Sequence, residues 1–398
     1  MSICKLIENN LSLVTHFIEQ QKFDEAEAVL DTILTIDPNS IKAMQLYAVS
    51  LSRQEKYEES IDLTLQIIEK DEVNLESYEH LGNCYMFLKQ FENTIKTFEK
   101  VLEIKPDYDA AHFYISHSCF ALGEWAKGWP HYEYRINQTF FNTKQKEKAW
   151  DGKQSLQGKK IIIYCEHGLG DYIYFIRFVP KLKELGAEVL IETPESLNTL
   201  FAKFGTIINF PNAVYYDYHC SVASLPYFLN VSEFKTAPYL TSDKLDLSEY
   251  KDNFKIGIAW TGNPGAVKYN AYRSCPKEYF NTLAEMNNVK LFSLQKDVSV
   301  EGVNAISMSD HMANFTETAK IIQAMDLIVT VDTSVMHLAG ALGKETWVLI
   351  AYYSDCRWTI KGNKSEWYDS ITLFRQEENN NWKTPFNEIE NKLKAKIQ

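Results

Sequence analysis

The sequence contains no apolar run long enough to cross a membrane, which takes about 18 to 20 consecutive residues in a helix. Its first residues, MSICKLIENNLSLVTHF, also lack the basic start and following apolar block of a secretory signal. We therefore expect neither a membrane span nor a secretory signal.

Cysteine is scarce and irregularly placed. Seven cysteines are scattered over 398 residues, and none forms a Cys-x-x-Cys pair. A zinc ribbon needs such pairs, and a disulfide framework is favoured by an even number of cysteines. The sequence therefore predicts buried thiols in a reducing, cytoplasmic compartment.

An excess of positive charge is also missing. Residues 1–140 contain 12 Lys and Arg against 23 Asp and Glu, a net charge of −11, and the remaining residues carry a net charge of −1. Nucleic-acid-binding proteins present basic surfaces to the phosphate backbone. The acidic first third therefore argues against a nucleic-acid partner, whereas the nearly neutral remainder can hold a local anion site.

The first third of the chain repeats with a period of 34 residues. Bulky aromatic residues recur at this interval, at Phe23, Tyr57, Phe91 and Trp125. The third unit, LESYEHLGNCYMFLKQFENTIKTFEKVLEIKPDYD, places apolar residues on one face of each of two helices. Such a period predicts paired helices stacked in a solenoid, and the pattern resembles the tetratricopeptide repeat. We expect residues 1–140 to form a helical array of these units.

In arrays of this kind the first helix of each repeat lines a concave surface. The sequence places these residues at the lining positions: Lys42, Gln45, Val49, Glu76, Glu79, Asn83, Phe113, His117 and Phe120. We expect a groove that binds a segment of another protein. The same surface could instead be a docking scaffold for the rest of the chain or a contact between copies in an oligomer.

Residues 141–250 have the pattern of an α/β half. The elements expected here form a parallel β-α-β unit: a strand at Lys160–Cys165, a helix at Tyr172–Leu185 and a strand at Glu188–Glu192. Gly168 and Gly170 lie in the turn before the helix and allow another molecule to approach closely. Ile173 occupies the third small position of a dinucleotide fingerprint, so a nicotinamide oxidoreductase is only weakly supported.

Asp171 opens the expected helix beside these two glycines. As a functional residue it could take a proton from an attacking hydroxyl group, as a general base. As a structural residue it would place a negative charge at the positive end of the helix dipole. The local sequence leaves both roles open.

Residues 251–398 have the pattern of a second α/β half. Thr261 and Gly262 follow an expected strand at Ile256–Trp260, with Lys268 and Arg273 close behind. Positive charge beside an anion-binding turn suits a diphosphate leaving group, although either cation could simply be a solvated surface residue. Gln295, at the end of an expected strand from Lys290, could contact a base or ribose.

Asp326–Ile350 has the pattern of a further β-α-β unit. An apolar strand at Leu327–Val331 is followed by Asp332, Thr333 and Ser334, and then by a short helix carrying His337 in its first turn. The unpaired N–H groups of such a helix start form an anion site. The alternative is that these polar residues only cap the helix.

The remaining expected elements are less regular. Strands are predicted at Ile207–Phe210, Val214–Tyr216 and Ser221–Ser224, and helices at Glu317–Met325 and from Thr384 onward. The segment after Ile350 is rich in aromatic and basic residues, and we expect it to be packed but irregular.

Several ordered motifs together resemble a known family. They are EHGLGDYIYFIRFVPKLKELGAEV, IGIAWTGNPG, LFSLQK, DLIVTVDTSVMHLAGALGKETWVL and RW-x8-WY-x4-LFRQ. The chain is similar to bacterial tetratricopeptide proteins with a heptosyltransferase-like domain of glycosyltransferase family 9. The resemblance implies a GT-B fold of two Rossmann-like halves, with the donor nucleotide on the C-terminal half and the acceptor facing the N-terminal half. It also implies an inverting reaction that needs no metal ion and no cofactor beyond the nucleotide-sugar substrate.

The resemblance also implies roles for individual residues. Asp171 matches the family's Gly-Asp position and would be the base, and the segment from Asp332 to His337 matches a D-[ST]-x-x-x-H element beside the donor diphosphate. The candidate set comprises Asp171, Lys268 and Arg273 as catalytic residues and Gly168, Gly170, Thr261, Gly262, Gln295, Asp332, Thr333, Ser334 and His337 as ligand-binding residues, with no metal ligand. Gln295 stands where the family tends to carry an acid, so the nucleotide base stays open.

Two functions from different classes follow from the sequence. The first is a metal-independent glycosyltransferase that moves a sugar from a nucleotide-sugar to an acceptor hydroxyl, on a protein recruited by the repeat array. The second is a nucleotide-binding scaffold whose transferase-like domain is inactive.

Overall fold

The computed structural model describes residues 3–135, 146–208, 214–234, 237–262 and 273–397. The chain divides into two compact units, Met1–Gln138 and Thr139–Gln398. Of the candidate site residues, Lys268 lies outside the described residues.

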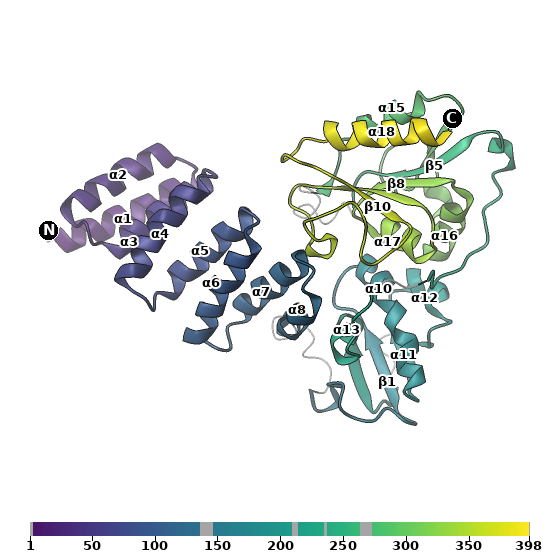
Figure 1. The fold of residues 1–398 in the computed structure, drawn as a ribbon, viewed down its shortest axis with the longest axis horizontal. Coiled ribbons are helices and arrows are strands. Elements are labelled where there is room, and N and C mark those ends of the chain that lie inside the picture. The colour runs from purple at the N-terminus through teal and green to yellow at the C-terminus, as the bar shows by residue number, and fades with distance from the viewer. Residues whose placement is uncertain (1–2, 136–145, 209–213, 235–236, 263–272, 398) are drawn as a thin grey trace. The chain divides into compact units, whose positions relative to one another are not determined.

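The first unit is an array of helices in which each helix packs against the next (Figure 1). In the described residues it consists of α1 (Ile3–Glu19), α2 (Phe23–Ile36), α3 (Ile41–Arg53), α4 (Tyr57–Lys70), α5 (Leu75–Phe87), α6 (Phe91–Ile104), α7 (Asp109–Ala121) and α8 (Trp125–Tyr132). The four aromatic residues of the 34-residue period are the first residues of α2, α4, α6 and α8. The predicted helical array is confirmed.

The turn inside each helix pair has the same backbone conformation. Two residues before each aromatic residue the φ angle is positive, at Gln21 (59°), Glu55 (64°), Lys89 (56°) and Gly123 (78°). A left-handed conformation is strained for any residue with a Cβ. Three of the four turns therefore adopt it without a glycine.

Small residues allow the helices of a pair to cross closely. A Cβ on Gly82 would lie 2.4 Å from the ring of Phe98, and one on Gly128 would lie 2.4 Å from the ring of Phe120. Phe120 is only 3% exposed. The expectation that Phe120 lines an open groove is therefore wrong, because its ring fills the crossing of α7 and α8.

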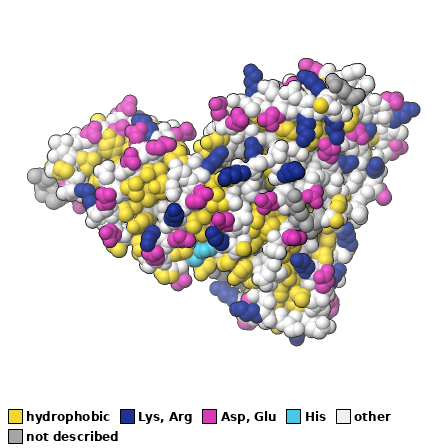
Figure 2. Space-filling view, viewed as in Figure 1, with side chains coloured by type: hydrophobic (Ala, Val, Ile, Leu, Met, Phe, Trp, Pro, Cys, Tyr) yellow, Lys and Arg dark blue, Asp and Glu magenta, His cyan; other side chains and the backbone are white. Residues whose placement is uncertain are grey.

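Other predicted groove positions do lie at the surface. Phe113 is 43% exposed, and Lys42 forms an ion pair with Glu76 at 3.3 Å between equivalent positions of neighbouring repeats. Figure 2 shows hydrophobic side chains lying among acidic ones on the visible face of this unit. Such a mixed surface is compatible with binding a protein segment.

The second unit contains two parallel sheets. The first has the strand order β3-β2-β1-β4. Its elements are β1 (Lys160–Tyr164), β2 (Glu188–Glu192), β3 (Thr206–Ile208) and β4 (Tyr218–Ser221), with α10 (Leu169–Phe175), α11 (Val179–Glu184), α12 (Glu195–Phe201) and α13 (Leu225–Phe228) and the 3-10 turns η1 (Lys146–Lys148), η2 (Ile176–Phe178) and η3 (Val222–Ser224).

Three sequence expectations for this half need correction. Val214–Tyr216 forms no strand. The strand expected at Ser221–Ser224 is instead β4, which ends at Ser221, because the Ser221 hydroxyl accepts a hydrogen bond from Ala223 N (3.1 Å) and starts a 3-10 turn. The helix expected from Tyr172 begins at Leu169, directly after Gly168.

The second sheet has six strands in the order β10-β9-β8-β5-β6-β7. Its strands are β5 (Phe254–Ala259), β6 (Val289–Ser293), β7 (Ile306–Ser307), β8 (Leu327–Val331), β9 (Thr346–Ile350) and β10 (Ile371–Arg375). Its helices are α15 (Asn281–Ala284), α16 (Phe315–Ala324), α17 (Ser334–Ala341) and α18 (Lys383–Ile397), with 3-10 turns η4 (Ser248–Tyr250), η5 (Lys277–Phe280), η6 (Ser309–His311) and η7 (Cys356–Trp358). The segment after Ile350 is thus not wholly irregular, because it contains β10.

The second sheet is covered on both faces (Figure 1). Alternate residues of β8, Leu327, Val329 and Val331, share one buried cluster with Phe386 and Ile389 of α18. Continuous apolar strands are typical of a parallel sheet buried on both faces. Two parallel-sheet halves after a helical array confirm the expected fold class, a Rossmann-like GT-B arrangement.

The two halves of the second unit pack together through helices. α10 contacts α17, and α12 contacts α16. A Cβ on Gly170 would lie 3.0 Å from Cδ2 of His337 and 3.4 Å from Cα of Ser334. Glycine at this position therefore lets the start of α10 lie directly against the start of α17.

Arg177 is a buried cation that joins these halves. Its side chain donates hydrogen bonds to the carbonyl oxygens of Tyr174 (2.8 Å), Phe234 (3.1 Å) and Trp367 (2.7 Å). Trp367 belongs to the second half, and the guanidinium also lies 4.3 Å from the ring centroid of Tyr368. Arg177 therefore ties α10 and η2 to the segment before β10.

The strained turns of the array lead to a stability prediction. Glu55→Gly should raise the free energy of unfolding by a few tenths to about 1 kcal/mol, because glycine adopts the left-handed conformation without a Cβ clash. The matched change Glu99→Gly, at an exposed position inside α6, should lower it by about 1 kcal/mol. Urea denaturation followed by helical circular dichroism measures both, and equal effects of the two changes would contradict the strained turn.

Candidate functional site

Each sheet of the second unit has a point where its strand order reverses. In the second sheet this point lies between β5 and β8, because β6 and β7 continue to one side and β9 and β10 to the other. Ligands of open α/β sheets bind outside the carboxyl ends of the strands at such a point. Thr261 follows β5 and Asp332 follows β8, so both predicted phosphate elements lie at this position.

The loop after β5 is anchored by Gln295. The Gln295 side-chain oxygen accepts hydrogen bonds from the backbone N–H groups of Trp260 (2.7 Å) and Thr261 (2.9 Å), and the residue is 5% exposed. The Thr261 hydroxyl lies 2.8 Å from that of Ser274. Gln295 therefore positions Thr261 and, next to it, Gly262; a direct contact of Gln295 with a nucleotide stays a prediction.

The start of α17 is not capped by a side chain. Thr333 occupies the N-cap position with an extended backbone (φ −142°, ψ 173°), and no side-chain hydrogen bond caps the helix in the described structure. Ser334 is the first helical residue. Simple capping therefore does not account for Asp332, Thr333 and Ser334, and the first-turn N–H groups remain suited to an anion.

Arg357, in η7, connects the residues around this helix start. Its guanidinium donates to Oδ1 of Asp171 in the first half (2.9 Å) and contacts Nε2 of His337 (3.0 Å). Oδ1 of Asp355 accepts two hydrogen bonds from Arg357, one from Nε of the guanidinium (2.9 Å) and one from the backbone N–H (3.0 Å). Burial alone would lower the pKa of Arg357, but the carboxylates of Asp355, Asp171 and Asp332 raise it well above its ordinary value. The guanidinium is therefore a fixed positive charge between the two halves.

His337 is neutral and has a defined tautomer. Arginine can only donate, so Nε2 of His337 accepts from Arg357, and Nδ1 carries the proton and donates to the Tyr368 hydroxyl at 3.0 Å. Burial lowers the pKa of His337 well below its ordinary value, and Arg357 and Arg177 lower it further. Both ring nitrogens of His337, a predicted ligand-binding residue, are therefore engaged by protein groups.

Asp171 lies across from α17 at the start of α10. Its Oδ2 accepts from Gly168 N (3.2 Å), and its Oδ1 accepts from Arg357. Its side chain is 20% exposed. The predicted base is therefore fixed by one contact from its own turn and one from the opposite half.

The side chain of Asp332 is positioned by Trp358. Its Oδ2 accepts a hydrogen bond from the indole N–H of Trp358 at 2.9 Å. Burial raises the pKa of Asp332, against the opposing effect of Arg357. Arg273, a predicted cation of the site, is also close enough to act electrostatically on both Asp332 and His337.

The first sheet has its own reversal point between β1 and β4. Glu166 follows β1, and its side chain is 2% exposed. One of its carboxylate oxygens accepts a hydrogen bond from the Ser221 hydroxyl at the end of β4. A buried carboxylate therefore spans the position where the first half would receive a ligand.

Sequence reasoning missed Arg357, Asp355 and Tyr368 as parts of the site. The motif RW-x8-WY contains Arg357 and Tyr368, but nothing in its spacing indicates that a turn after β9 reaches Asp171 and His337. The presence of this motif directly after the buried strand β9 was the one available signal, because its arginine, tyrosine and tryptophans indicate a packed segment.

The described residues include no group of three or more His, Cys, Asp or Glu side chains placed to hold a metal ion. Within the same residues, no helix is both long and apolar enough to span a membrane.

The low pKa of His337 predicts a specific pH dependence. Below about pH 6.5 the unfolded chain takes up a proton on His337 that the folded protein does not, so this residue lowers stability by up to about 1.4 kcal/mol per pH unit as pH falls. His337→Gln should remove that part of the slope in denaturation series measured between about pH 7 and pH 5. The exposed His311 provides the control: His311→Gln should keep the wild-type slope, and an unchanged slope in His337→Gln would refute the assignment.

Comparison with known families matches two parts of the chain. Residues 231–393 match glycosyltransferase family 9 (heptosyltransferase), a range that contains all six strands of the second sheet. Residues 75–108 match the tetratricopeptide repeat and contain α5 and α6.

Individual relatives are distant. Protein FlbA of Caulobacter vibrioides is 23% identical over 325 residues, which is 69% of this chain and 53% of that protein. The chain thus spans about half the length of this curated relative. Two structures of the protein MamA cover 33% of this chain and 77% or 75% of theirs, at 20% or 21% identity and a TM-score of 0.30. From these matches, residues 75–108 are similar to a tetratricopeptide repeat and residues 231–393 to a glycosyltransferase family 9 (heptosyltransferase) domain.

Proposed function

We propose that this protein is a glycosyltransferase that moves a sugar from a nucleotide-sugar donor to an acceptor hydroxyl. The observation that carries the proposal is the arrangement around Arg357. The helix with the uncapped start, through His337, and a carboxylate from the opposite half both contact this one charged group.

The donor diphosphate would bind on the second half. The first-turn N–H groups of α17 and the hydroxyl groups of Thr333 and Ser334 offer donors, and the loop at Thr261 and Gly262 offers more. Arg273 adds positive charge close to Asp332 and His337. Lys268, which follows the same loop in the sequence, would add a second cation. Charge that develops on the leaving diphosphate is stabilised by such preorganised donors and cations without a metal ion.

Asp171 would act as the base. In a single displacement, the acceptor oxygen forms a bond to the anomeric carbon as the bond from that carbon to the diphosphate oxygen breaks. Asp171 takes the acceptor proton, and the nucleoside diphosphate leaves with the electron pair. The configuration at the anomeric carbon is inverted, because attack and departure occur on opposite faces.

The acceptor would be a protein recruited by the repeat array. Exposed side chains such as Phe113 and the polar pair Lys42–Glu76 offer both apolar and polar contacts. The acceptor would reach the reversal point of the first sheet, where the buried Glu166 and Ser221 lie.

We propose a cytoplasmic location for the protein, because nucleotide-sugars are available and thiols stay reduced in the cytoplasm.

One observation favours a second function. Asp171 is ion-paired with Arg357 at 2.9 Å, so its Oδ1 is occupied by the guanidinium and does not face an acceptor hydroxyl. A scaffold that binds nucleotide but transfers no sugar would keep the Asp171–Arg357 ion pair at all times. A transferase would have to release Asp171 when the donor diphosphate competes for Arg357.

Replacing Asp171 separates these functions. Asp171→Asn should lower sugar transfer by roughly 10²- to 10⁴-fold, because the amide cannot accept the proton. Affinity for a nucleoside diphosphate should stay the same or rise, because the Asp171 carboxylate no longer competes for Arg357. The assay is transfer or hydrolysis with a panel of nucleotide-sugars, with binding followed by calorimetry.

The control for this experiment is Asp151→Asn, at an exposed position, which should leave both quantities unchanged. Transfer by Asp171→Asn near the wild-type rate would remove Asp171 as the base. A wild-type protein that binds diphosphates but turns over none of the donors would favour the scaffold.

Arg357 should couple the two halves energetically. In a double-mutant cycle of Asp171→Asn and Arg357→Lys, we expect a coupling free energy of about 1 to 2 kcal/mol, because lysine cannot contact Asp171, His337 and Asp355 at once. Denaturation of the four proteins gives this value. Additive effects would show that the ion pair does not hold α10 against α17, and Arg53→Lys on α3 is the matched control for the arginine change.

A further inference from the structure

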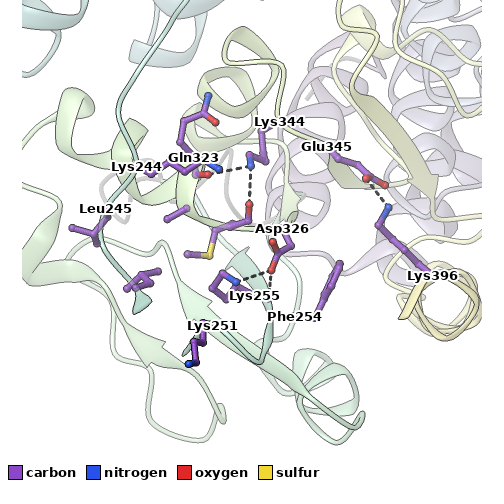
Figure 3. Close-up of a pocket in the computed structure, with 13 residues that line it drawn as sticks. Lys244, Leu245, Lys251, Phe254, Lys255, Gln323, Asp326, Lys344, Glu345 and Lys396 are labelled. Atoms are coloured by element: carbon purple, nitrogen blue, oxygen red, sulfur yellow. Dashed lines mark hydrogen bonds and ion pairs between the residues drawn. The ribbon is translucent and has the colours of Figure 1, made fainter. Parts of the chain in front are cut away.

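A cavity of about 630 Å³ lies at the edge of the second sheet opposite to the site described above (Figure 3). Phe254 begins β5, Asp326 precedes β8 and Glu345 precedes β9, so the cavity adjoins the amino ends of these strands. Strands of five or six residues separate it from Thr261 and Thr333 by roughly 15 to 20 Å. It is therefore a separate site.

The cavity is basic, whereas the chain as a whole carries a charge of −12. Its walls include five lysines and two carboxylates: Lys244, Lys251, Lys255, Lys344 and Lys396, with Asp326 and Glu345. This is a local excess of three positive charges. An accumulation of one sign inside a concave wall raises the local concentration of ions of the opposite sign.

Three of the lysines are held in place by the protein. Lys344 Nζ donates to the carbonyl oxygens of Gln323 (3.2 Å) and Met325 (2.7 Å). Lys255 pairs with Asp326 at 3.0 Å, and Lys396 pairs with Glu345 at 2.8 Å. These contacts, drawn in Figure 3, fix part of the positive wall before any ligand binds.

The other two lysines lie where the chain passes from the first half into the second. Among the described residues, the side chains of Lys244 and Lys251 form no hydrogen bond or ion pair, and Lys251 N donates to Ser248 O at 3.2 Å. The segment itself is anchored, because Leu245 N donates to Lys320 O of α16 at 3.0 Å. Two ammonium groups with unused donors are therefore presented to the cavity by a positioned backbone.

The pKa of Lys344 reflects the like charges beside it. Burial lowers this pKa, Lys244 and Lys255 lower it further, and Asp326 opposes them. Like charges held together in this way repel each other. An anion in the cavity would relieve that repulsion.

The wall also contains apolar residues, namely Leu245, Leu247, Phe254 and Met325. Lysine binds phosphate groups as a point charge and needs no fixed planar geometry.

We infer that this cavity binds a small multivalent phosphate anion, with inorganic pyrophosphate as the simplest example. Lys244 and Lys251 would supply the free donors, and Lys255 and Lys344 the fixed charge behind them. Because Lys244 and Lys251 belong to the connecting segment, the bound anion would fasten this segment to the second half. The inference is independent of the proposed transfer reaction.

The test uses the full chain and pyrophosphate. Lysine acetylation mapped by mass spectrometry should show Lys244 and Lys251 protected by pyrophosphate, a readout that a second diphosphate site near Thr333 does not affect. In calorimetry, Lys244→Gln/Lys251→Gln should weaken binding at this site by at least about tenfold, as expected for the loss of two ammonium–phosphate contacts.

The matched control is Lys153→Gln/Lys181→Gln, which removes the same charge from exposed positions of the first half. It should keep wild-type protection of Lys244 and Lys251. No protection in the wild-type protein, or equal weakening by both double variants, would overturn the inference. Loss of sugar transfer has no bearing on it, so failure of the proposed function would be recognised separately.

Discussion

The positive charge of Arg357 needs partners from three directions, and the arrangement of the site follows from this requirement. A guanidinium carries its donors in one plane, so the groups that accept from it must meet in a fixed geometry. Asp355 comes from the same turn, His337 from α17 and Asp171 from the opposite half. Gly170 favours these contacts, because it lets two helix starts lie directly against each other.

The parts of this protein that could be predicted are those determined by local sequence. The 34-residue period identified the stacked helix pairs of the array, because each repeat packs mainly against its neighbours. The strands β1, β5, β6 and β8 were expected within a few residues of their observed ends, because buried parallel strands are continuous apolar runs. The loops after them were therefore correctly placed at the carboxyl edge of each sheet.

The parts that could not be predicted depend on contacts between distant segments. The partner of Asp171 lies 186 residues away along the chain, and no local pattern indicates which cation will meet a given carboxylate. Gln295 has the residue type of a ligand contact, yet its oxygen holds the backbone of Trp260 and Thr261. Phe120 was expected at a surface because its position in the repeat usually faces outward, but Gly128 leaves a space that its ring fills.

Arg177 sets a cost on separating the two halves of the second unit. Its guanidinium is 6% exposed and bonds to carbonyl oxygens on both sides of the boundary. Pulling the halves straight apart would leave a buried charge without its partners, which costs roughly 3 to 5 kcal/mol. A single buried arginine therefore resists separation of two halves that are otherwise folded around sheets of their own.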